Sequence, residues 1–348
     1  MNCSPSLTLG AMTNATVLGP AEVPQLRYAS VMSSPTPAAR GFFDQARVIV
    51  VAGKGGVGKT TIAAALGLLS SACGHPTELV DVEDRNDLGR CFGLTGIGFQ
   101  PTEVQAASKN NESLAVRSLA AEDAAVEYLT DQGMGRVLKL LRGAGTLLDT
   151  LTSLTPGLRS VLQLAKVRSI SDDDPNKVVI VDAPAAGHAV SFLRSPLGLL
   201  ASIDSGPLHH QSKSVVDMFG DHARSQVLLV TLPEYTPVQE TIETAYTLEE
   251  DLGLKLSPVV VNKTLPVWDG LDRTLSAAAT KSSHAAALAE AARLRDMRQR
   301  EQQDQIQLMT TDLPLPTIAL PELLVQEMTA GPLQELADLL SAGFGEPR

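Results

Sequence analysis

The chain contains 348 residues and carries a formal net charge of −11 at pH 7; 44% of its residues are hydrophobic and only 3% are aromatic. No basic patch is visible, so the phosphate groups of nucleic acids or of an anionic membrane surface would repel the chain, and we expect it to bind neither. Because aromatic residues are scarce, the core must consist mainly of Ala, Val and Leu, which suits helices packed closely on a parallel sheet.

The cysteines, the apolar stretches and the N-terminus exclude several other classes of protein. Cys3, Cys73 and Cys91 share no spacing typical of metal ligands, so neither a disulfide framework nor a structural zinc site is expected. No stretch reaches about 18 apolar residues without a charge or a proline, so no membrane insertion is expected. Residues 1–42 are rich in Ser, Thr, Pro and Met and have no basic segment before an apolar stretch. We predict a disordered tail there and a cytoplasmic protein, held at a membrane only through a partner.

The first predicted element is a buried parallel strand at residues 48–51, followed by a helix from residue 60. Between them, residues 53–60 read GKGGVGKT, a complete phosphate-binding loop with an additional lysine, Lys54. The glycines let successive backbone N–H groups surround a phosphate, and the helix dipole adds partial positive charge at the same point. Lys59 is expected to contact the β- and γ-phosphates and the Thr60 hydroxyl to ligate Mg²⁺. The predicted nucleotide-binding residues of this segment are Gly53, Gly55, Gly56, Val57, Gly58, Lys59, Thr60 and Thr61.

Further strands follow along the chain and define the fold class. Four strand-like runs are bounded by turn residues and separated by helix-length segments; they span residues 77–82, 177–182, 226–232 and 258–262. This alternation predicts an α/β fold with a doubly wound, mostly parallel sheet of the P-loop NTPase type, in one domain over residues 43–348. Ligands of such sheets gather at the carboxyl ends of the strands, where Asp182 and Asn262 fall.

Two helical insertions are predicted within this domain. From about residue 121 to 171, apolar residues recur at three- and four-residue steps. This period indicates helices, and their apolar stripe forms either part of the core or a groove for a client protein. The second insertion, about residues 270–309, is rich in Ala and then in Arg and Gln, and its charges are expected to form a solvated face.

Asp182 ends a predicted strand and is followed by a segment that contains Pro184 and Gly187. A carboxylate at this position is expected to hold Mg²⁺ through a water molecule, and the segment after it can move when the γ-phosphate leaves. A helix cap is the alternative role for Asp182. His188 is either a contact in the moving segment or only a histidine at the start of a helix.

Five segments combine in a specific pattern: the loop with its additional lysine, residues 182–188, residues 192–194, residues 232–241 and residues 259–263. Together they resemble the family of arsenite-pump and guided-entry-of-tail-anchored-proteins ATPases, and most of all its actinobacterial branch of anion-transporting ATPases. The resemblance covers about residues 46–343 and implies a deviant phosphate-loop ATPase.

The resemblance implies a dimer in which Lys54 reaches across the interface to the partner's nucleotide. This dimer would be a homodimer or a heterodimer with a paralogous ATPase subunit. The resemblance also implies that Asn262 and the loop of Pro321, Glu322 and Leu323 flank adenine, so ATP and Mg²⁺ are the expected cofactors. A lysine inserted in trans would stabilise charge that develops on the transferred phosphoryl group, and hydrolysis would depend on dimer closure.

The chain departs from the family pattern at two places. Where the family has an Asp that orients the attacking water, the segment 82–93 has Glu83, and Asp84 is the alternative. The longer side chain shifts the carboxylate, and misplacement by about 1 Å can cost roughly a hundredfold in rate, so slow or partner-dependent turnover is one hypothesis. The paired-cysteine zinc clasp and the clustered thiols of an arsenite sensor are absent from the sequence, so neither metalloid binding nor a zinc-held dimer is expected.

Three functions compete on these grounds. The favoured one is a dimeric switch that hydrolyses Mg-ATP with Lys54, Glu83 and Asp182 as catalytic residues, and whose insertion handles a client or partner protein. The alternative is a nucleotide-binding subunit with weak or no ATPase activity of its own that regulates a paralogous partner. A partitioning ATPase that binds membrane or DNA is disfavoured, because the amphipathic segment 331–340 is acidic rather than basic.

Overall fold

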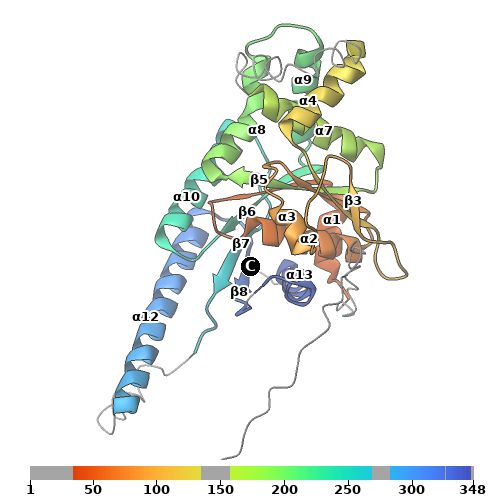
Figure 1. Ribbon diagram of the computed structural model, residues 1–348. Coiled ribbons are helices and arrows are strands. Elements are labelled where there is room, and N and C mark those ends of the chain that lie inside the picture. Colours follow the sequence, from red (N-terminus) through yellow and green to blue (C-terminus); the bar gives the residue numbers. More distant parts are fainter. Residues whose placement is uncertain (1–33, 135–156, 269–282, 326, 346–348) are drawn as a thin grey trace, which may run out of the picture.

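The structure of the protein is a computed structural model, which describes residues 34–134, 157–268, 283–325 and 327–345. In this part of the chain, eight strands form one sheet in the order β3-β4-β2-β5-β1-β6-β7-β8 (Figure 1). Only the edge strand β3 runs antiparallel to its neighbour, so the sheet is mostly parallel, as predicted. The strands are β1 (Val48–Gly53), β2 (Thr77–Asp81), β3 (Thr102–Gln105), β4 (Leu114–Ser118), β5 (Val178–Ala185), β6 (Ser225–Thr231), β7 (Val259–Thr264) and β8 (Thr317–Pro321).

The central strands are buried on both faces, which explains their continuous apolar sequences. Strand β1 is buried along its whole length and lies between β5 and β6, where Val50 pairs with Val181 on one side and with Val227 on the other. Because side chains alternate between the two faces of a strand, Ile49 enters one core while Val48 and Val50 enter the other. The sheet therefore separates two apolar cores.

The first core lies between the sheet and the helices on one of its faces. Helix α2, which follows the phosphate loop, packs against the C-terminal helix α13. Leu333, Leu336 and Leu340 of α13 are buried in the core that the two helices share with the sheet. Helix α1 packs beside both. The helices of this face are α1 (Pro37–Gln45), α2 (Lys59–Cys73), α3 (Asp87–Cys91) and α13 (Ala330–Phe344).

Helix α1 joins the two ends of the described chain. The Thr36 hydroxyl caps α1 by accepting the N–H of Ala39 at 3.2 Å, and it donates to the carbonyl of Ser341 in α13 at 2.7 Å. The Phe42 ring stacks on Phe344 with 4.6 Å between centroids. The expected tail boundary at residue 42 therefore falls inside α1, because these contacts join segments about 300 residues apart that a local pattern cannot connect. Residues 1–33 of the expected tail lie outside the described residues.

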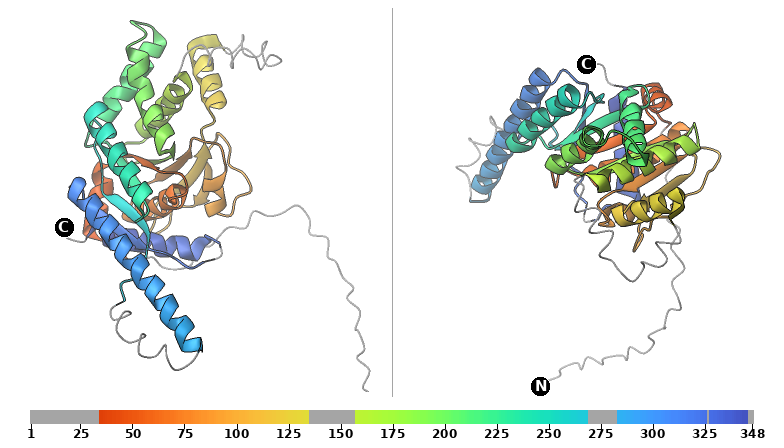
Figure 2. Two further views of the ribbon diagram at one scale, coloured as in Figure 1. Left: turned by 90° about the vertical axis from the view of Figure 1, so that its left-hand side faces the viewer. Right: turned by 90° about the horizontal axis from the view of Figure 1, so that it is seen from above.

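The second core lies on the opposite face, where helices from the middle of the chain cover the sheet. Figure 1 shows α4, α7, α8 and α9 gathered at one end of the molecule, while the long helix α12 projects away from the sheet in the other direction, as Figure 2 also shows. The elements of this part are α4 (Ala121–Leu129), its π-helical continuation η1 (Thr130–Met134), α7 (Leu158–Asp173), α8 (Ala186–Leu200), α9 (Pro207–Gly220), α10 (Tyr235–Tyr246) with η2 (Thr247–Asp251), and α12 (Ser283–Asp312).

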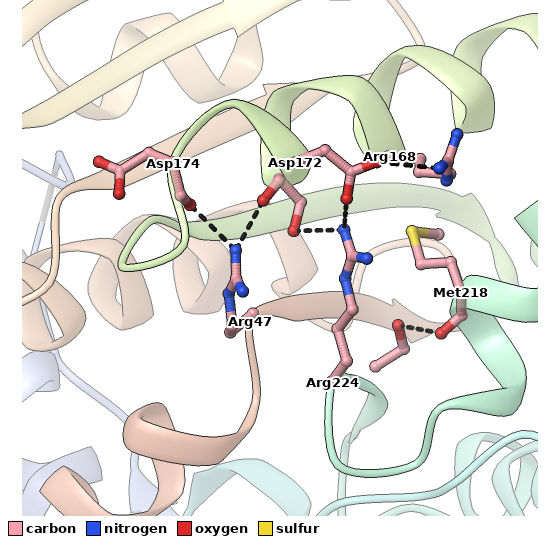
Figure 3. Close-up of polar contacts among 8 residues, drawn as sticks. Arg47, Arg168, Asp172, Asp174, Met218 and Arg224 are labelled. Carbon is pink, nitrogen blue, oxygen red and sulfur yellow. Dashed lines mark hydrogen bonds and ion pairs between the residues drawn. The ribbon is translucent and has the colours of Figure 1, made fainter.

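Two arginines attach the C-terminal end of α7 to the sheet (Figure 3). Arg47, just before β1, donates to the carbonyls of Ser171 and Asp174 at 2.6 and 2.9 Å. Arg224, just before β6, donates to the Ser171 hydroxyl at 3.0 Å and pairs with Asp172. These contacts satisfy carbonyl groups that a helix end leaves without partners, and they hold α7 against the amino ends of two central strands.

The five strands predicted from the apolar runs are confirmed as β1, β2, β5, β6 and β7, whereas β3, β4 and β8 were not predicted. The described parts of the first predicted insertion are helical, and residues 135–156, which hold most of its apolar stripe, lie outside the described residues. The second predicted insertion, about residues 270–309, is helical from residue 283 onward as part of α12, which continues to Asp312, and residues 269–282 are again outside the described residues. Among the helices that the structure describes, none is long and apolar enough to cross a membrane.

Candidate nucleotide-binding site

The predicted phosphate-binding loop lies between the end of β1 and the start of α2, as the sequence indicated. Two positions of this loop require glycine because atoms of β6 and β7 lie very close to the loop backbone. Gly53 has φ 153° and a Cβ there would collide with the carbonyl of Val230, while Gly58 has φ 97° and a Cβ there would collide with the Asn262 amide. The loop therefore has the left-handed backbone and close packing that only glycine accepts without strain.

Asn262, in β7, holds the phosphate loop from the side. Its Nδ2 donates to the carbonyl of Val57 at 2.8 Å, and its Oδ1 accepts the N–H of Lys263 at 3.0 Å. The side chain is buried, so these two bonds fix its orientation. The role of Asn262 beside adenine stays a prediction; what the structure adds is a bond that ties β7 to the loop.

Thr60, in the first turn of α2, donates its hydroxyl proton to Asp182 Oδ2 at 2.6 Å. Asp182 is 9% exposed, and its burial raises the pKa of its carboxyl to about 7, with Asp81 and Glu83 adding repulsion while Thr60 and Lys59 oppose the shift. The predicted neighbours of the terminal phosphate thus meet at the carboxyl ends of β1 and β5.

Thr60 and Asp182 offer the oxygen ligands that Mg²⁺ prefers. Within the described residues, Asp182 Oδ1 is buried without a hydrogen-bond partner, which is costly for a carboxylate unless a cation or water completes the site. In the described part of the chain, no group of three or more His, Cys, Asp or Glu side chains is arranged so that it could hold a metal ion by itself. Thr60 and Asp182 therefore fit a Mg²⁺ ion that takes its remaining ligands from phosphates and water rather than from further protein side chains.

Lys59 Nζ donates to the carbonyl of Lys54 at 3.2 Å, within the same loop. The side chain is partly buried, and this burial lowers the pKa of Lys59, while the nearby carboxylates of Asp182 and Glu83 oppose the shift. An anionic ligand in the loop would give this ammonium a partner with opposite charge. The geometry therefore agrees with the predicted contact between Lys59 and a phosphate.

The segment after β2 holds the two candidates for the residue that orients water. Asp81, at the strand end, accepts the N–H groups of Glu83 and Asp84 at 2.9 and 3.2 Å and so shapes the turn. The Asp84 carboxylate accepts the hydroxyl of Ser118 at 2.7 Å, which directs it toward β4. The Glu83 carboxylate, in contrast, acts electrostatically on both Lys59 and Asp182, and it pairs with Arg85 at 3.2 Å. The structure thus brings Glu83, rather than Asp84, toward the phosphate loop.

Lys54 is the additional lysine of the loop, and its ammonium lies 2.6 Å from Glu240 Oε1 of the same chain. Glu240 belongs to α10, which follows β6. The two side chains are 35% and 39% exposed, so this is a partly solvated ion pair. Sequence reasoning placed Glu240 in a tract that resembles the family but gave it no role, because 186 positions separate the two residues along the chain.

The loop predicted to flank adenine follows β8, at the same edge of the sheet as Asn262. Thr264 of β7 pairs with Pro321 of β8, and the N–H of Glu322 donates to the Thr264 carbonyl at 3.0 Å. Leu323 packs against the first core. The two predicted adenine segments therefore lie on neighbouring strands, and their contact with a nucleotide stays a prediction.

A cavity of about 670 Å³ lies between this site and the helical end of the molecule. Its walls come from the segment after β2, the first residues of α4 and α7, and the segment after β5, and they include Glu83, Gln163 and His188. Gln163, in α7, was missed in the sequence because its buried position depends on the packing of distant elements. His188 lies in the first turn of α8, so both of its predicted roles remain open.

A comparison of the chain with protein families matches the part of the sequence that builds this site. Residues 46–205 match the model of the family described as anion-transporting ATPase (ArsA). Over these residues the chain is similar to this family. The match begins just before β1 and includes the phosphate loop, the segment after β2 and the segment after β5, so it covers the elements that build the site.

Several known ATPases are similar to the chain. ATPase BagA from Mycobacterium tuberculosis is 34% identical over 227 residues, which cover 63% of this chain and 66% of BagA. A candidate arsenical pump-driving ATPase from Halobacterium salinarum is 27% identical over 64% of this chain and 36% of its own length. ATPase GET3B from Arabidopsis thaliana is 23% identical over 62% of this chain and 64% of its own length. The matched part thus spans just under two thirds of BagA.

Proposed function

We propose that the chain binds Mg-ATP and hydrolyses it slowly as a dimeric switch, and that the change in shape acts on a client or partner protein. The observation that carries this proposal is the hydrogen bond of 2.6 Å between Thr60 and Asp182 beside a complete phosphate loop. It joins the two residues that would hold Mg²⁺, Thr60 at the start of α2 and Asp182 on β5, at the end of the sheet where ligands of such folds bind. The similarity of residues 46–205 to the anion-transporting ATPase family supports ATP as the nucleotide.

Hydrolysis in this proposal uses the chain's own groups in distinct roles. The loop N–H groups and Lys59 bind the phosphates, Thr60 and Asp182 would hold Mg²⁺, and Glu83 orients the attacking water. Bound Mg²⁺ would neutralise charge that develops on the phosphoryl oxygens. Lys54 supplies additional positive charge from the partner subunit when the dimer closes. The extra methylene of Glu83 and its ion pair with Arg85 favour slow turnover.

The site is connected to the helical end of the molecule through Gln163. Its Nε2 donates to the carbonyl of Val82 at 2.9 Å and to the carbonyl of Leu119 at 2.6 Å. Val82 immediately precedes Glu83, and Leu119 follows β4, so one buried side chain of α7 contacts the ends of two strands. A shift of the segment after β2 would therefore move α7, and we propose this contact as the route to the client surface.

A second candidate function is a nucleotide-binding subunit that hydrolyses little ATP and regulates a paralogous partner. The ion pair between Lys54 and Glu240 favours it, because in this conformation the lysine is engaged within its own chain. The two functions differ in the activity of the isolated chain: only the switch is expected to release phosphate without a second type of subunit.

The test combines isothermal titration calorimetry with Mg-ATP and steady-state phosphate release by the full chain. Wild type is expected to bind Mg-ATP and to release phosphate slowly, and Lys59→Ala is the control that should lose both signals. Turnover that occurs only after a paralogous ATPase subunit is added would favour the second function. No heat of binding by the chain, alone or with that subunit, would contradict both.

A further inference from the structure

The ion pair between Lys54 and Glu240 occupies the lysine that the proposed function needs elsewhere. The distance of 2.6 Å between Nζ and Oε1 is that of a direct, charge-assisted hydrogen bond. An ammonium held in this way points to a carboxylate of its own subunit and cannot lie at the same time against the nucleotide of a partner. One of the two arrangements must end before the other begins.

Both partners of this ion pair are positioned by the fold. The backbone carbonyl of Lys54 accepts a hydrogen bond from Lys59, which fixes the loop where the lysine side chain starts. On α10, Val238 and Ile242 are buried in the second core, and the Thr241 hydroxyl donates to the Pro237 carbonyl at 2.7 Å. The helix is therefore anchored on the sheet, and Glu240 is presented from a fixed surface.

We infer that Glu240 is a positioning residue that holds Lys54 inside its own subunit until the dimer closes on nucleotide. The inference rests on the proposed function, because it concerns the lysine that acts in trans. In the separate subunit Lys54 pairs with Glu240, and as two subunits approach, Glu240 competes with the partner's phosphates for this ammonium. When the dimer closes, the three phosphates and their higher charge density take the lysine, and Glu240 is released to solvent.

The solvent exposure of Lys54 and Glu240 determines how strongly their ion pair restrains the lysine. Both side chains are more than one third exposed, so water and salt screen their attraction. Pairs of this kind shift an equilibrium only modestly, and we expect their loss to raise the fraction of free Lys54 by about two- to fivefold. The ion pair thus makes dimer closure less favourable but does not prevent it.

Glu240→Gln in the full chain tests the inference with two independent measurements. The first is acylation of Lys54 by an amine-specific reagent in the nucleotide-free chain, quantified by peptide mass spectrometry; it should rise about two- to fivefold. The second is phosphate release at a limiting concentration of chain, which should rise by a similar factor while Mg-ATP affinity stays unchanged. Glu243→Gln is the matched control, because this exposed residue lies one turn further along α10 and loses the same charge.

A double variant separates the restraint from a general change in the site. In the Lys54→Ala background, Glu240→Gln should have no effect on phosphate release, since the lysine that it frees is missing. Unchanged acylation of Lys54 in Glu240→Gln, or a rate that falls or stays level while acylation rises, would overturn the inference. A wild-type chain without turnover, alone or with a paralogous subunit, would instead overturn the proposed function, and the acylation result would still report whether the ion pair exists.

Discussion

At the scale of single residues, two lysines of one loop have different surroundings. Lys59 is bonded within the loop and its ammonium is near Asp182 and Glu83, whereas Lys54 leaves the loop toward α10. Lys54→Ala is therefore expected to bind Mg-ATP within about twofold of wild type but to lose phosphate release by a hundredfold or more, the size of effect seen when a transition-state cation is removed. Calorimetry and phosphate release measure the two quantities separately, and normal turnover by Lys54→Ala would exclude its action in trans.

The buried carboxyl of Asp182 makes the stability of the nucleotide-free chain depend on pH. Its pKa rises from 3.8 to about 7 on folding, mainly because burial disfavours the charged form. Below pH 3.8 this carboxyl is protonated in both the folded and the unfolded chain. Between pH 3.8 and about 7 only the unfolded chain loses the proton, so the carboxyl's stabilising contribution is lost as pH rises through this range.

Asp182→Asn keeps a neutral side chain of similar shape at every pH and so serves as the reference. The difference in thermal unfolding midpoint, wild type minus Asp182→Asn, should become steadily less favourable to wild type up to about pH 7 and then level off. Measurements without Mg²⁺ or nucleotide are required, since a bound cation would stabilise the carboxylate. A midpoint difference that stays constant from pH 4 to pH 8 would show that this carboxyl is ionised normally.

At the scale of helices and strands, the sequence predicted those elements that a local pattern of residues marks. Strands β1, β5, β6 and β7 contain unbroken runs of buried apolar residues, whereas β2 is buried along its length but contains Glu78 and Asp81 beside its apolar residues. Strands β3 and β4 lie at the margin of the sheet; β3 is only partly buried, and β4 contains Arg117, which is buried in an ion pair with Glu78. A strand of mixed composition at an edge lacks the periodic signal on which sequence reasoning depends.

The same division holds for the site. The phosphate loop and Asp182 were predicted because each comes directly after a buried apolar run; in the structure Asp182 lies within β5, which continues to Ala185, and the strand order brings Thr60 and Asp182 together. Glu240 and Gln163 could not be assigned roles, because their contacts join residues 186 and 81 positions apart. Such contacts depend on how helices pack across the sheet, and no local pattern encodes them.

The two hydrogen bonds of Gln163 join helix α7 to the ends of β2 and β4, and removing them tests this connection. Gln163→Leu removes two donated hydrogen bonds and leaves the carbonyls of Val82 and Leu119 without their partner inside the protein. The free energy of unfolding should fall by about 1–3 kcal/mol, and phosphate release should fall more than Mg-ATP binding. Urea denaturation measures the first effect. Ser169→Ala, at an exposed position of the same helix, is the control and should stay within about 0.5 kcal/mol of wild type.

Equal unfolding free energies for Gln163→Leu and Ser169→Ala would show that the two carbonyls find other partners, so that α7 is not held to the strand ends by this side chain. A variant that loses stability but keeps the wild-type ratio of hydrolysis to binding would separate a structural role from a coupling role. The arginine contacts at the other end of α7 remain in both variants, so any effect belongs to the end nearest the site.

At the scale of the whole molecule, the charge of the chain opposes the dimer that the proposed function requires. Each copy carries a formal net charge of −11, so two copies repel at low ionic strength, where charges act over a longer distance. Raising NaCl from about 20 mM to about 150 mM shortens the screening length from roughly 20 Å to 8 Å and should weaken this repulsion. Self-association in saturating Mg-ATP should therefore become several-fold tighter.

Sedimentation velocity over a range of chain concentrations measures this dependence, and Lys59→Ala provides the control in which nucleotide-driven association should be absent at either salt concentration. The sign of the salt effect is diagnostic of the surfaces that meet. If two identical net-negative copies associate, salt helps; if the chain associates with a basic paralogous subunit, salt weakens the complex, because it screens attraction instead of repulsion. Self-association that weakens as salt rises would mean that locally complementary charges outweigh the net charge, and would contradict the repulsive account of the homodimer.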